Sequence, residues 1–525
     1  MVAKTVGVAL AVALSWSSAV AARSPSEIVI TADAARPGPT ISRNILGQFS
    51  EHLGKGIYEG IWVGPSSTIP NTRGIRNDVV TALKAIKPPN VRWPGGCFAD
   101  AYHWKNGIGP TRPVSLNASW GGVLEPNTFG SHEFFDFIDQ IGADAYLSVN
   151  VGSGAPQEAA DWLEYLTTDQ PSALGQLRAR NGHPAPYKVA MLGLGNEAWG
   201  CGGSMPAADY VQQMRQFSTY AHNFNPAQQK TDKMLRIAVG PDRDDYAWTE
   251  TVMQAWTKRV WSWDIDAISL HAYTWAKGTG ERATGFTPSQ YAALLKDTLR
   301  MEEMVGKHAA VMDKYDPDKK VGLVVDEWGT WFAPEPGEPD HSLYQQNTQR
   351  DALVAALNLN IFARHADRVR GANIAQMINA LQAMILTDGP RMLRTPTYHV
   401  FALYAPFQDA RLVPLTFEAG VYKEGEVTLP RLDAIGAIGK DGKLWLAMTN
   451  LDPRAPLPVK LGVAGYSVAG AQARTLSGEA MGAYNSFEAP DQVAPQPIVL
   501  RQQGQAGALV LPPHSVTVIG LNPAR

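Results

Sequence analysis

The clearest pattern along the chain is an alternation of short apolar runs with amphipathic stretches between about residue 45 and residue 400. A short apolar run is typical of a buried parallel strand, whereas apolar residues spaced three and four apart indicate a helix. Helical spacing covers 131–141, 207–224 and 343–366. The apolar runs are 45–50, 90–93, 145–149, 189–194, 236–239, 267–270, 322–325 and 373–377. Eight strands alternating with helices predict an α/β fold, a (β/α)8 TIM barrel.

The pattern changes after residue 404. Short apolar or alternating runs such as 443–450, 508–511 and 515–521 are separated by Gly, Pro, Asp and Asn, without helical spacing. They predict a C-terminal antiparallel β-sandwich of jelly-roll type over 405–525. The run at 27–32 also reads as a strand, so we expect segment 23–44 to pack with the sandwich and 45–404 to form the catalytic barrel.

The first residues resemble an export signal. Lys4 precedes an apolar stretch at 6–14, and Ala19-Val-Ala21 is a small-residue cleavage pattern. We therefore expect a signal peptide at 1–22, cleaved after Ala21 or Ala22, and a periplasmic or secreted protein. No other segment approaches the 18 apolar residues that a membrane span needs, so no membrane partner is expected.

Composition narrows the class of partner. The 525 residues fit two domains, charged residues make up 18%, and the net charge is −3. No basic stripe is present, so a nucleic-acid partner is not expected. The two cysteines, Cys97 and Cys201, are too few for a disulfide scaffold, although export would permit one bridge.

Polar residues occupy the carboxyl ends of all eight predicted strands. In TIM barrels the active site is built from these ends, which meet on one face. The residues are Glu51, Arg92, Asn150, Glu197, Asp242, His271, Glu327 and Gln376.

Two glutamates stand out among them. Glu197 and Glu327 each follow an apolar run and precede a tryptophan by one or two residues. A single Glu at a strand end is commonly a solvated turn residue, but an acid beside aromatic residues is costly unless it has a partner or a function. Two such acids predict paired-carboxylate chemistry on a glycosidic bond.

Five motifs give this pair a family. Phe49-Ser-Glu-His-Leu53, Val91-Arg-Trp-Pro-Gly-Gly96, Gly195-Asn-Glu197, Leu270-His-Ala-Tyr273 and Asp326-Glu-Trp328 resemble, in order, the signatures of the family 51 α-L-arabinofuranosidases. The resemblance implies a retaining exo-hydrolase that removes terminal non-reducing α-L-arabinofuranosyl residues from arabinoxylan, arabinan and related oligosaccharides. It implies no cofactor and no metal, and it implies a homo-oligomer.

The resemblance also assigns the chemistry. Glu197 would be the general acid/base and Glu327 the nucleophile, with Arg92 and Tyr273 keeping Glu327 ionised. Because 130 residues separate the two glutamates along the chain, only the fold can bring them together.

Further residues would bind the sugar. Glu51 would hold hydroxyls deep in the pocket, Asn196 would bond the 2-hydroxyl, and His271 would orient Glu197 or the substrate. A glutamine would bind another hydroxyl, and the local alignment leaves Gln376 and Gln382 as rivals. Three other strand-end residues are interpreted as structural: Asn150, Asp242 and Asp326.

One position departs from the family. Cys97 stands where many members have a sugar-contacting Asn, so it belongs among the substrate-binding positions. Cys201 follows Glu197 by four residues, which places both cysteines beside the same pocket. They form either a bridge or two small buried thiols, since zinc-type Cys/His spacing is absent.

Five tryptophans are candidates for the wall of the pocket, and we expect about half of them to be plain core. They are Trp93, Trp104, Trp199, Trp328 and Trp331. Two alternatives to the exo-enzyme stay open at this point. One is an endo-β-1,4-glucanase or xylanase on the same scaffold, and the other is a non-catalytic carbohydrate-binding protein.

Overall fold

Eight parallel strands close into a barrel, which confirms the predicted fold class. The structure is a computed structural model that describes residues 27–275, 282–503 and 506–524. Around the barrel the order is β2-β5-β8-β9-β10-β11-β12-β13, and β13 pairs with β2 to close it. The strands are β2 (Gly47–Phe49), β5 (Asn90–Trp93), β8 (Asp144–Ser148), β9 (Val189–Leu194), β10 (Leu235–Ala238), β11 (Ala267–Trp275), β12 (Gly322–Trp331) and β13 (Val369–Ile374).

Two strands extend further than the sequence pattern predicts. β11 and β12 continue past the barrel rim because they keep pairing with each other, up to Trp275 opposite Trp331. Their apolar runs end at 270 and 325, but main-chain hydrogen bonding does not depend on side-chain polarity. β13 lies earlier than predicted and ends at Ile374, so Gln376 sits in the loop that follows it.

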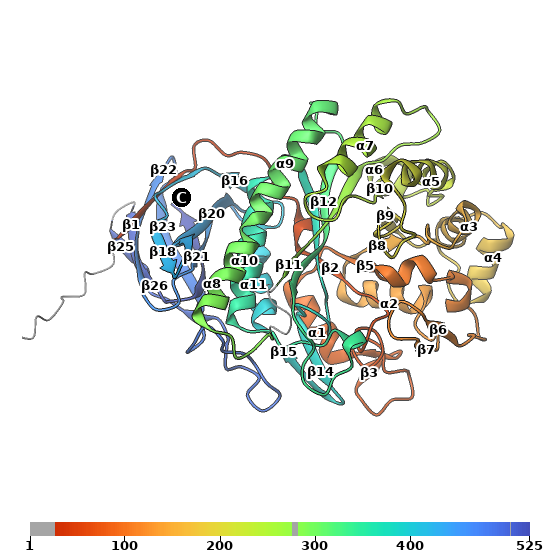
Figure 1. Cartoon of the computed structure of the whole chain (residues 1–525), viewed down its shortest axis with the longest axis horizontal. Coiled ribbons are helices and arrows are strands. Elements are labelled where there is room, and N and C mark those ends of the chain that lie inside the picture. The colour runs from red at the N-terminus through yellow and green to blue at the C-terminus, as the bar shows by residue number, and fades with distance from the viewer. Residues whose placement is uncertain (1–26, 276–281, 504–505, 525) are drawn as a thin grey trace, which may run out of the picture.

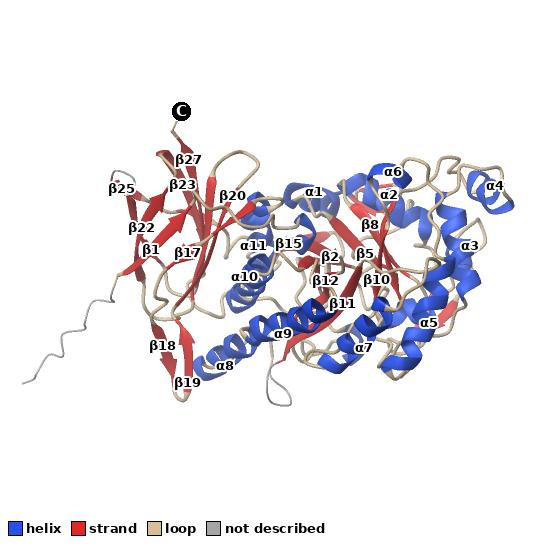
Figure 2. Cartoon of the chain, turned by 90° about the horizontal axis from the view of Figure 1, so that it is seen from above, coloured by secondary structure: helices blue, strands red, loops and turns tan. Residues whose placement is uncertain are grey.

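Helices surround the barrel, and several of them lie between it and the second domain (Figure 1). They are α1 (Asn77–Ile86), α2 (Ser131–Ile141), α3 (Pro156–Thr167), α4 (Ala173–Arg180), α5 (Ala207–Tyr220), α6 (Gln228–Thr231), α7 (Tyr246–Thr257), α8 (Pro288–Thr298), α9 (Arg300–Tyr315), α10 (Gln349–Arg364) and α11 (Pro396–Tyr404). α10 starts later than predicted because Thr348 caps it, and the Asp351 side chain accepts from the Thr348 N–H in return. All of α10 except its last residue is buried, since it lies between the barrel and the sandwich (Figure 2).

The second domain is a sandwich of two sheets, with strand orders β17-β1-β22-β26-β25 and β16-β20-β21-β27-β23-β24. The first sheet contains β17 (Leu415–Thr416), β1 (Ile28–Asp33), β22 (Leu457–Ala464), β26 (Ala506–Leu511) and β25 (Arg501–Gln503). The second contains β16 (Arg411–Val413), β20 (Leu432–Ile438), β21 (Leu444–Asn450), β27 (Ser515–Pro523), β23 (Val468–Leu476) and β24 (Gln496–Pro497). Short hairpins decorate both domains: β3–β4 (Asn71–Thr72, Ile75–Arg76), β6–β7 (Ser115–Asn117, Val123–Glu125), β14–β15 (Ile385–Asp388, Arg391–Arg394) and β18–β19 (Val421–Glu424, Val427–Pro430).

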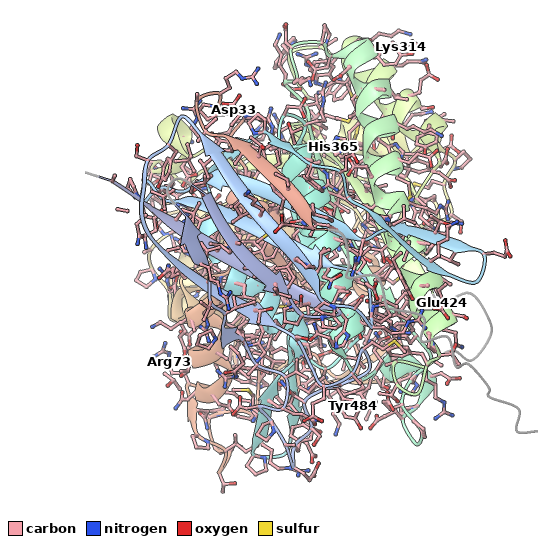
Figure 3. All side chains as sticks on the ribbon, turned by 90° about the vertical axis from the view of Figure 1, so that its left-hand side faces the viewer. Asp33, Arg73, Lys314, His365, Glu424 and Tyr484 are labelled. Carbon is pink, nitrogen blue, oxygen red and sulfur yellow. A yellow bond between two sulfur atoms is a disulfide. The ribbon has the colours of Figure 1, made fainter. Side chains whose placement is uncertain are left out.

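Strand β1 precedes the barrel in the sequence but belongs to the sandwich. It runs parallel to β22 and antiparallel to β17. Figure 3 shows it as the orange strand near Asp33, among the blue strands of the C-terminal domain. Its alternate residues Ile28, Ile30 and Ala32 are buried in the sandwich core, as period-two alternation requires.

The predicted signal peptide at 1–22 lies outside the described residues. Within the described part of the chain, no helix combines the length and apolar character required to cross a bilayer.

Candidate active site

Three titratable side chains meet at the carboxyl ends of the barrel strands. Glu197 follows β9, His271 lies on β11 and Glu327 lies on β12. One nitrogen or oxygen of each lies within 4.8 Å of one atom of each of the others. Glu197 and Glu327, distant in sequence, are therefore neighbours in the fold.

Glu327 is held by two donors. Nη1 of Arg92 donates to its Oε1 at 2.6 Å, and the Tyr273 hydroxyl donates to its Oε2 at 2.8 Å. Burial lowers the pKa of Arg92, but the charges of Asp326 and Glu327 raise that pKa above its usual value overall, so the guanidinium stays charged. The two donors fix the orientation of the Glu327 carboxylate, and the bond from Arg92 is charge-assisted.

Glu197 has a different environment. Its φ is 36°, in the left-handed region that non-glycine residues rarely adopt, and such backbone strain is concentrated at functional sites. Burial and then the charge of Glu327 raise its pKa, whereas a hydrogen bond from His271 and the charge of Arg92 oppose that rise. A carboxyl with a raised pKa is suited to donate a proton.

His271 links the two glutamates to a third acid. Its Nδ1 lies 2.9 Å from Oε1 of Glu197 and 3.6 Å from Oε2 of Glu327, and its Nε2 lies 3.2 Å from Oδ1 of Asp326. Burial lowers the pKa of His271, but Glu327, Asp326 and Glu197 together raise it to about 10. The imidazole is therefore protonated at neutral pH and presents a donor on each side.

Asp326 is more than the structural residue that the sequence indicated. It lies 3.5 Å from Nε of Arg92, faces His271, and accepts a hydrogen bond from the Tyr146 hydroxyl at 2.7 Å. Regular alternation would place Asp326 and Glu327 on opposite faces of β12, but the register of β12 shifts between Val325 and Trp328, and both acids contact Arg92 and His271. Alternation alone therefore conceals the connection of Asp326 to the site.

Glu51 lies in the same pocket. Its Oε1 accepts from the backbone N–H groups of Gly96 and Phe98, both at 3.0 Å, and from Nε1 of Trp120 at 2.9 Å. Burial and the charge of Glu327 raise its pKa to about 7. Gly95, with φ 155°, permits this close approach, because a Cβ there would lie 2.5 Å from Cγ of Glu51.

Trp120 was not anticipated. It lies in the turn of the β6–β7 hairpin, directly before Gly121 and Gly122. An aromatic residue inside an otherwise polar, glycine-rich turn is the signal that could have found it.

The two rival glutamines are separated by the fold. Nε2 of Gln376 donates to Oε2 of Glu51 at 3.0 Å, and its buried Oε1 has no hydrogen-bond partner among the described residues. Gln382 instead accepts from the Thr330 N–H and donates to the Asp351 carbonyl. Gln376 therefore lies in the site with a free acceptor, while Gln382 ties β12 to α10.

Asn196 lies between the catalytic candidates and the cysteines. Its Oδ1 accepts from Nη2 of Arg92 at 2.6 Å, and its Nδ2 lies 3.7 Å from Sγ of Cys201. The other two strand-end residues make local contacts: Asn150 bonds the Tyr102 carbonyl and Ser153, and Asp242 pairs with Arg243.

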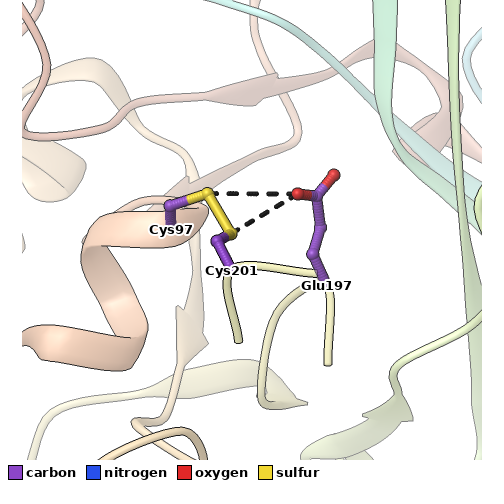
Figure 4. Close-up of side chains that lie close together, drawn as sticks. All are labelled: Cys97, Glu197 and Cys201. Atoms are coloured by element: carbon purple, nitrogen blue, oxygen red, sulfur yellow. Dashed lines mark hydrogen bonds between the residues drawn. A yellow bond between two sulfur atoms is a disulfide. The ribbon is translucent and has the colours of Figure 1, made fainter. Parts of the chain in front are cut away.

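Cys97 and Cys201 are joined by a disulfide. Their sulfurs lie 4.0 Å and 3.5 Å from Oε2 of Glu197 (Figure 4). A disulfide sulfur carries no proton, so it touches this oxygen without donating to it. Oε1 of Glu197 thus faces His271, and Oε2 faces the bridge.

The tryptophans divide between core and pocket wall. Trp93, Trp104 and Trp328 are buried core residues, and Trp199 is partly buried and donates to the Gly240 carbonyl. Trp331 packs edge-on against Tyr273 and stacks on Trp275, with ring centroids 4.9 Å apart. Trp275 was missed because the predicted strand ended at 270; it shares a face with Tyr273, two residues earlier.

Two groups of side chains are close enough to hold a metal ion in the described part of the chain: Cys97 with Glu197 and Cys201, and Glu197 with His271 and Glu327. In the first group the sulfurs are bonded to each other. In the second, Nδ1 of His271 already contacts the carboxylates of Glu197 and Glu327.

Comparisons with known proteins agree with this geometry. The "Alpha-L-arabinofuranosidase 1 domain" family model matches residues 82–289, and the "Alpha-L-arabinofuranosidase C-terminal domain" model matches 326–515. A relative from Bacteroides ovatus, named an intracellular exo-alpha-L-arabinofuranosidase, is 42% identical over 92% of this chain and 93% of its own length.

Solved structures give the same result. A GH51 arabinofuranosidase from Xanthomonas axonopodis pv. citri has a TM-score of 0.91 and 47% identity, covering 94% of this chain and 100% of that one. An α-L-arabinofuranosidase from Thermotoga maritima, in complex with arabinose, has a TM-score of 0.82 and 31% identity, covering 94% of this chain and 99% of that one.

The predicted location is contradicted by these comparisons. We expected an exported protein, but the Bacteroides ovatus relative is named intracellular. The prediction was wrong because it relied only on the composition of residues 1–22, where a short apolar run after one lysine does not determine location.

The family assignment, by contrast, rests on residues of both domains. Sequence identity of this extent covers the barrel and the sandwich alike. The chain therefore belongs to the family 51 α-L-arabinofuranosidases.

Proposed function

We propose that this protein is a retaining, exo-acting α-L-arabinofuranosidase that hydrolyses terminal non-reducing α-L-arabinofuranosyl residues. The observation that carries the proposal is the spacing of the two glutamates, whose nearest oxygens lie within 4.8 Å. Retaining glycosidases place their carboxyls roughly 5–5.5 Å apart, whereas inverting enzymes need roughly 6.5–9.5 Å for a water molecule.

The environments of the two acids assign their roles. Glu327, bonded by Arg92 and Tyr273, attacks the anomeric carbon as the ionised nucleophile. Glu197 protonates the departing oxygen through Oε2, because its Oε1 is already bonded to His271. Once the glycosyl-enzyme forms, Glu327 loses its charge, and the pKa of Glu197 falls so that it can act as the base for water.

The remaining polar groups fit a single furanose ring. The free Oε1 of Gln376 accepts from one hydroxyl, and Glu51, fixed by its donors, binds others. Asn196, oriented by Arg92, bonds the 2-hydroxyl, a contact that strengthens as oxocarbenium character develops. Cys97 lies at the neighbouring position and is bonded to Cys201. It can therefore contact the sugar only through its sulfur surface, without the amide of the Asn that many family members have there.

We propose arabinoxylan, arabinan and related oligosaccharides as substrates. The family relationship supports arabinose-containing glycans, and the choice among them is the finer part of the proposal. A homo-oligomer is also proposed from the family relationship, and sedimentation velocity tests it.

The decisive experiment compares product and viscosity. The enzyme should release free arabinose from arabinoxylan and arabinan with little early loss of viscosity, and should cleave an aryl α-L-arabinofuranoside but not an aryl cellobioside. Rapid viscosity loss on xylan or a soluble cellulose, without free arabinose, would establish the endo-acting alternative. Binding to these polymers without hydrolysis of either aryl glycoside would establish the non-catalytic one.

A further inference from the structure

The disulfide beside Glu197 has a chemistry that the hydrolytic reaction does not use. We propose that reduction of the Cys97–Cys201 bridge creates a binding site for a zinc-type divalent cation, ligated by the two thiolates and Oε2 of Glu197. Occupation of this site removes the general acid and switches the enzyme off.

The geometry of the three ligand atoms supports this site. The sulfurs of Cys97 and Cys201 lie 4.0 Å and 3.5 Å from Oε2 of Glu197, and the three atoms fall within 4.8 Å of one another. Tetrahedral zinc with Zn–S of about 2.3 Å and Zn–O of about 2.0 Å separates sulfur from oxygen by roughly 3.5 Å. The Sγ of Cys201 already has this separation from the carboxylate.

Two distances must change: the sulfurs must move apart, and Sγ of Cys97 must approach Oε2 of Glu197 from 4.0 Å to roughly 3.5 Å. Two thiolates on one tetrahedral zinc lie roughly 3.8 Å apart. The Cα atoms of Cys97 and Cys201 are 5.5 Å apart, so rotation of the two side chains can supply this separation while the backbone stays in place. Cys201 is exposed and Cys97 half-buried, so a reductant and a cation can both reach the bridge.

The chemical steps balance with a phosphine as reductant. A trialkylphosphine cleaves the S–S bond and becomes the phosphine oxide by taking the oxygen of one water molecule. The two protons of that water end on the two sulfurs. Zinc then displaces both thiol protons, which are released to solvent.

The expected loss of activity follows from which oxygen is taken. Oε1 of Glu197 is bonded to His271, so Oε2 is the oxygen left to protonate the leaving group. An oxygen bound to zinc cannot carry that proton. This step rests on the proposed role of Glu197, whereas cation binding itself does not.

A second group near the same carboxylate provides an internal comparison. Glu197, His271 and Glu327 are also close enough for a cation, but that set is independent of the cysteines. Inhibition through it would be the same whether the bridge is oxidised or reduced.

The test uses the full chain in two states, untreated and reduced with tris(2-carboxyethyl)phosphine, with circular dichroism to show that both are folded. Cobalt(II) is the spectroscopic probe and zinc the inhibitor. In the reduced protein we expect one cobalt per chain, with thiolate-to-cobalt charge transfer and intense tetrahedral d–d bands. We also expect zinc to inhibit the reduced enzyme at a concentration at least about tenfold lower than the untreated one, reversibly with EDTA.

Two variants test the contributions of the carboxylate and the thiolates to cobalt binding separately. Reduced Glu197→Gln should keep the charge-transfer band but bind cobalt about tenfold more weakly, whereas the matched variant Glu158→Gln, at a carboxylate that pairs with His103 and is outside the ligand group, should bind like the parent. Cys201→Ser should lose the tetrahedral spectrum with or without reductant.

Equal zinc sensitivity of the two redox states, or a folded reduced protein that gives no cobalt–thiolate band, would overturn the inference. A reduced chain that forms the cobalt site but hydrolyses no arabinofuranoside in either state would uphold the site and contradict the proposed function alone.

Discussion

Nδ1 of the buried His271 lies 2.9 Å from Oε1 of Glu197, so a charged imidazole holds the proposed acid/base. This contact lowers the pKa of a carboxyl whose pKa burial and the charge of Glu327 raise. The pKa of Glu197 thus depends on opposing interactions, and mutation of His271 removes one that lowers it.

Replacing His271 should move the pH profile upward. In His271→Ala the hydrogen bond and charge that lower the pKa of Glu197 are gone, so this pKa rises further. The acid then stays protonated to higher pH, and the alkaline limb of kcat/KM on an aryl arabinofuranoside shifts towards higher pH, although kcat falls. Unlike this variant, His103→Ala changes an exposed histidine and should leave the limb in place. An alkaline limb that stays fixed or moves to lower pH in His271→Ala contradicts the proposed interaction.

The two glutamates should respond differently to the leaving group. Glu327→Ala removes the proposed nucleophile, so activity should collapse on every substrate. Glu197→Ala removes proton donation, which a dinitrophenolate leaving group scarcely needs but an arabinoxylan does. The ratio of the two activities should therefore change by about 10²–10⁴-fold, measured by steady-state kinetics.

Azide provides an independent check on the same variant. In Glu197→Ala this small anion should attack the trapped intermediate and speed turnover, giving the β-arabinosyl azide that double displacement demands. Equal losses on both substrates without azide rescue would mean that the acid/base lies elsewhere.

Gln376 and Gln382 should show opposite phenotypes. Gln376→Ala removes a proposed sugar contact, so kcat/KM should fall by about 10-fold, with little change in Tm because Glu51 keeps its other donors. Gln382→Ala leaves the buried Thr330 N–H on β12 without its acceptor and removes a tie to α10, which costs about 1–3 kcal/mol of stability. Thermal melts and kinetics on the two purified variants test the pair, and the reverse pattern would exchange their roles.

Mass spectrometry after alkylation should detect the disulfide between Cys97 and Cys201. Alkylation of the folded protein without reductant should label neither cysteine, and alkylation after reduction should label both. Because the bridge closes a long loop, its reduction should cost roughly 2–4 kcal/mol and lower Tm. Two labelled cysteines in an active, untreated sample would show that the bridge is absent.

The barrel could be predicted from sequence because its strands are buried on both faces and read as continuous apolar runs. The same reasoning placed Glu197, His271 and Glu327 on one face, since parallel strands share their carboxyl edge. Strand lengths were less accessible: β11 and β12 continue through main-chain pairing beyond their apolar runs, which concealed Trp275.

Other parts of the site depend on contacts that the pattern of hydrophobic and polar positions along the sequence does not predict. Trp120 reaches Glu51 from a hairpin inserted between two strands, and Asp326 acts through His271 and Arg92. The choice between Gln376 and Gln382 depended on a loop after β13 that alternation does not describe.

The position of β1 has a consequence for how the chain is made. A ribosome releases residues 28–33 before the barrel, but their parallel partner β22 appears only at 457–464. At roughly 5–20 residues per second, the strand waits tens of seconds with Ile28 and Ile30 unpartnered while the whole barrel emerges. The C-terminal sheet is therefore completed from the two extremes of the polypeptide, and a fragment beginning at the barrel would leave β17 and β22 with an open edge between them.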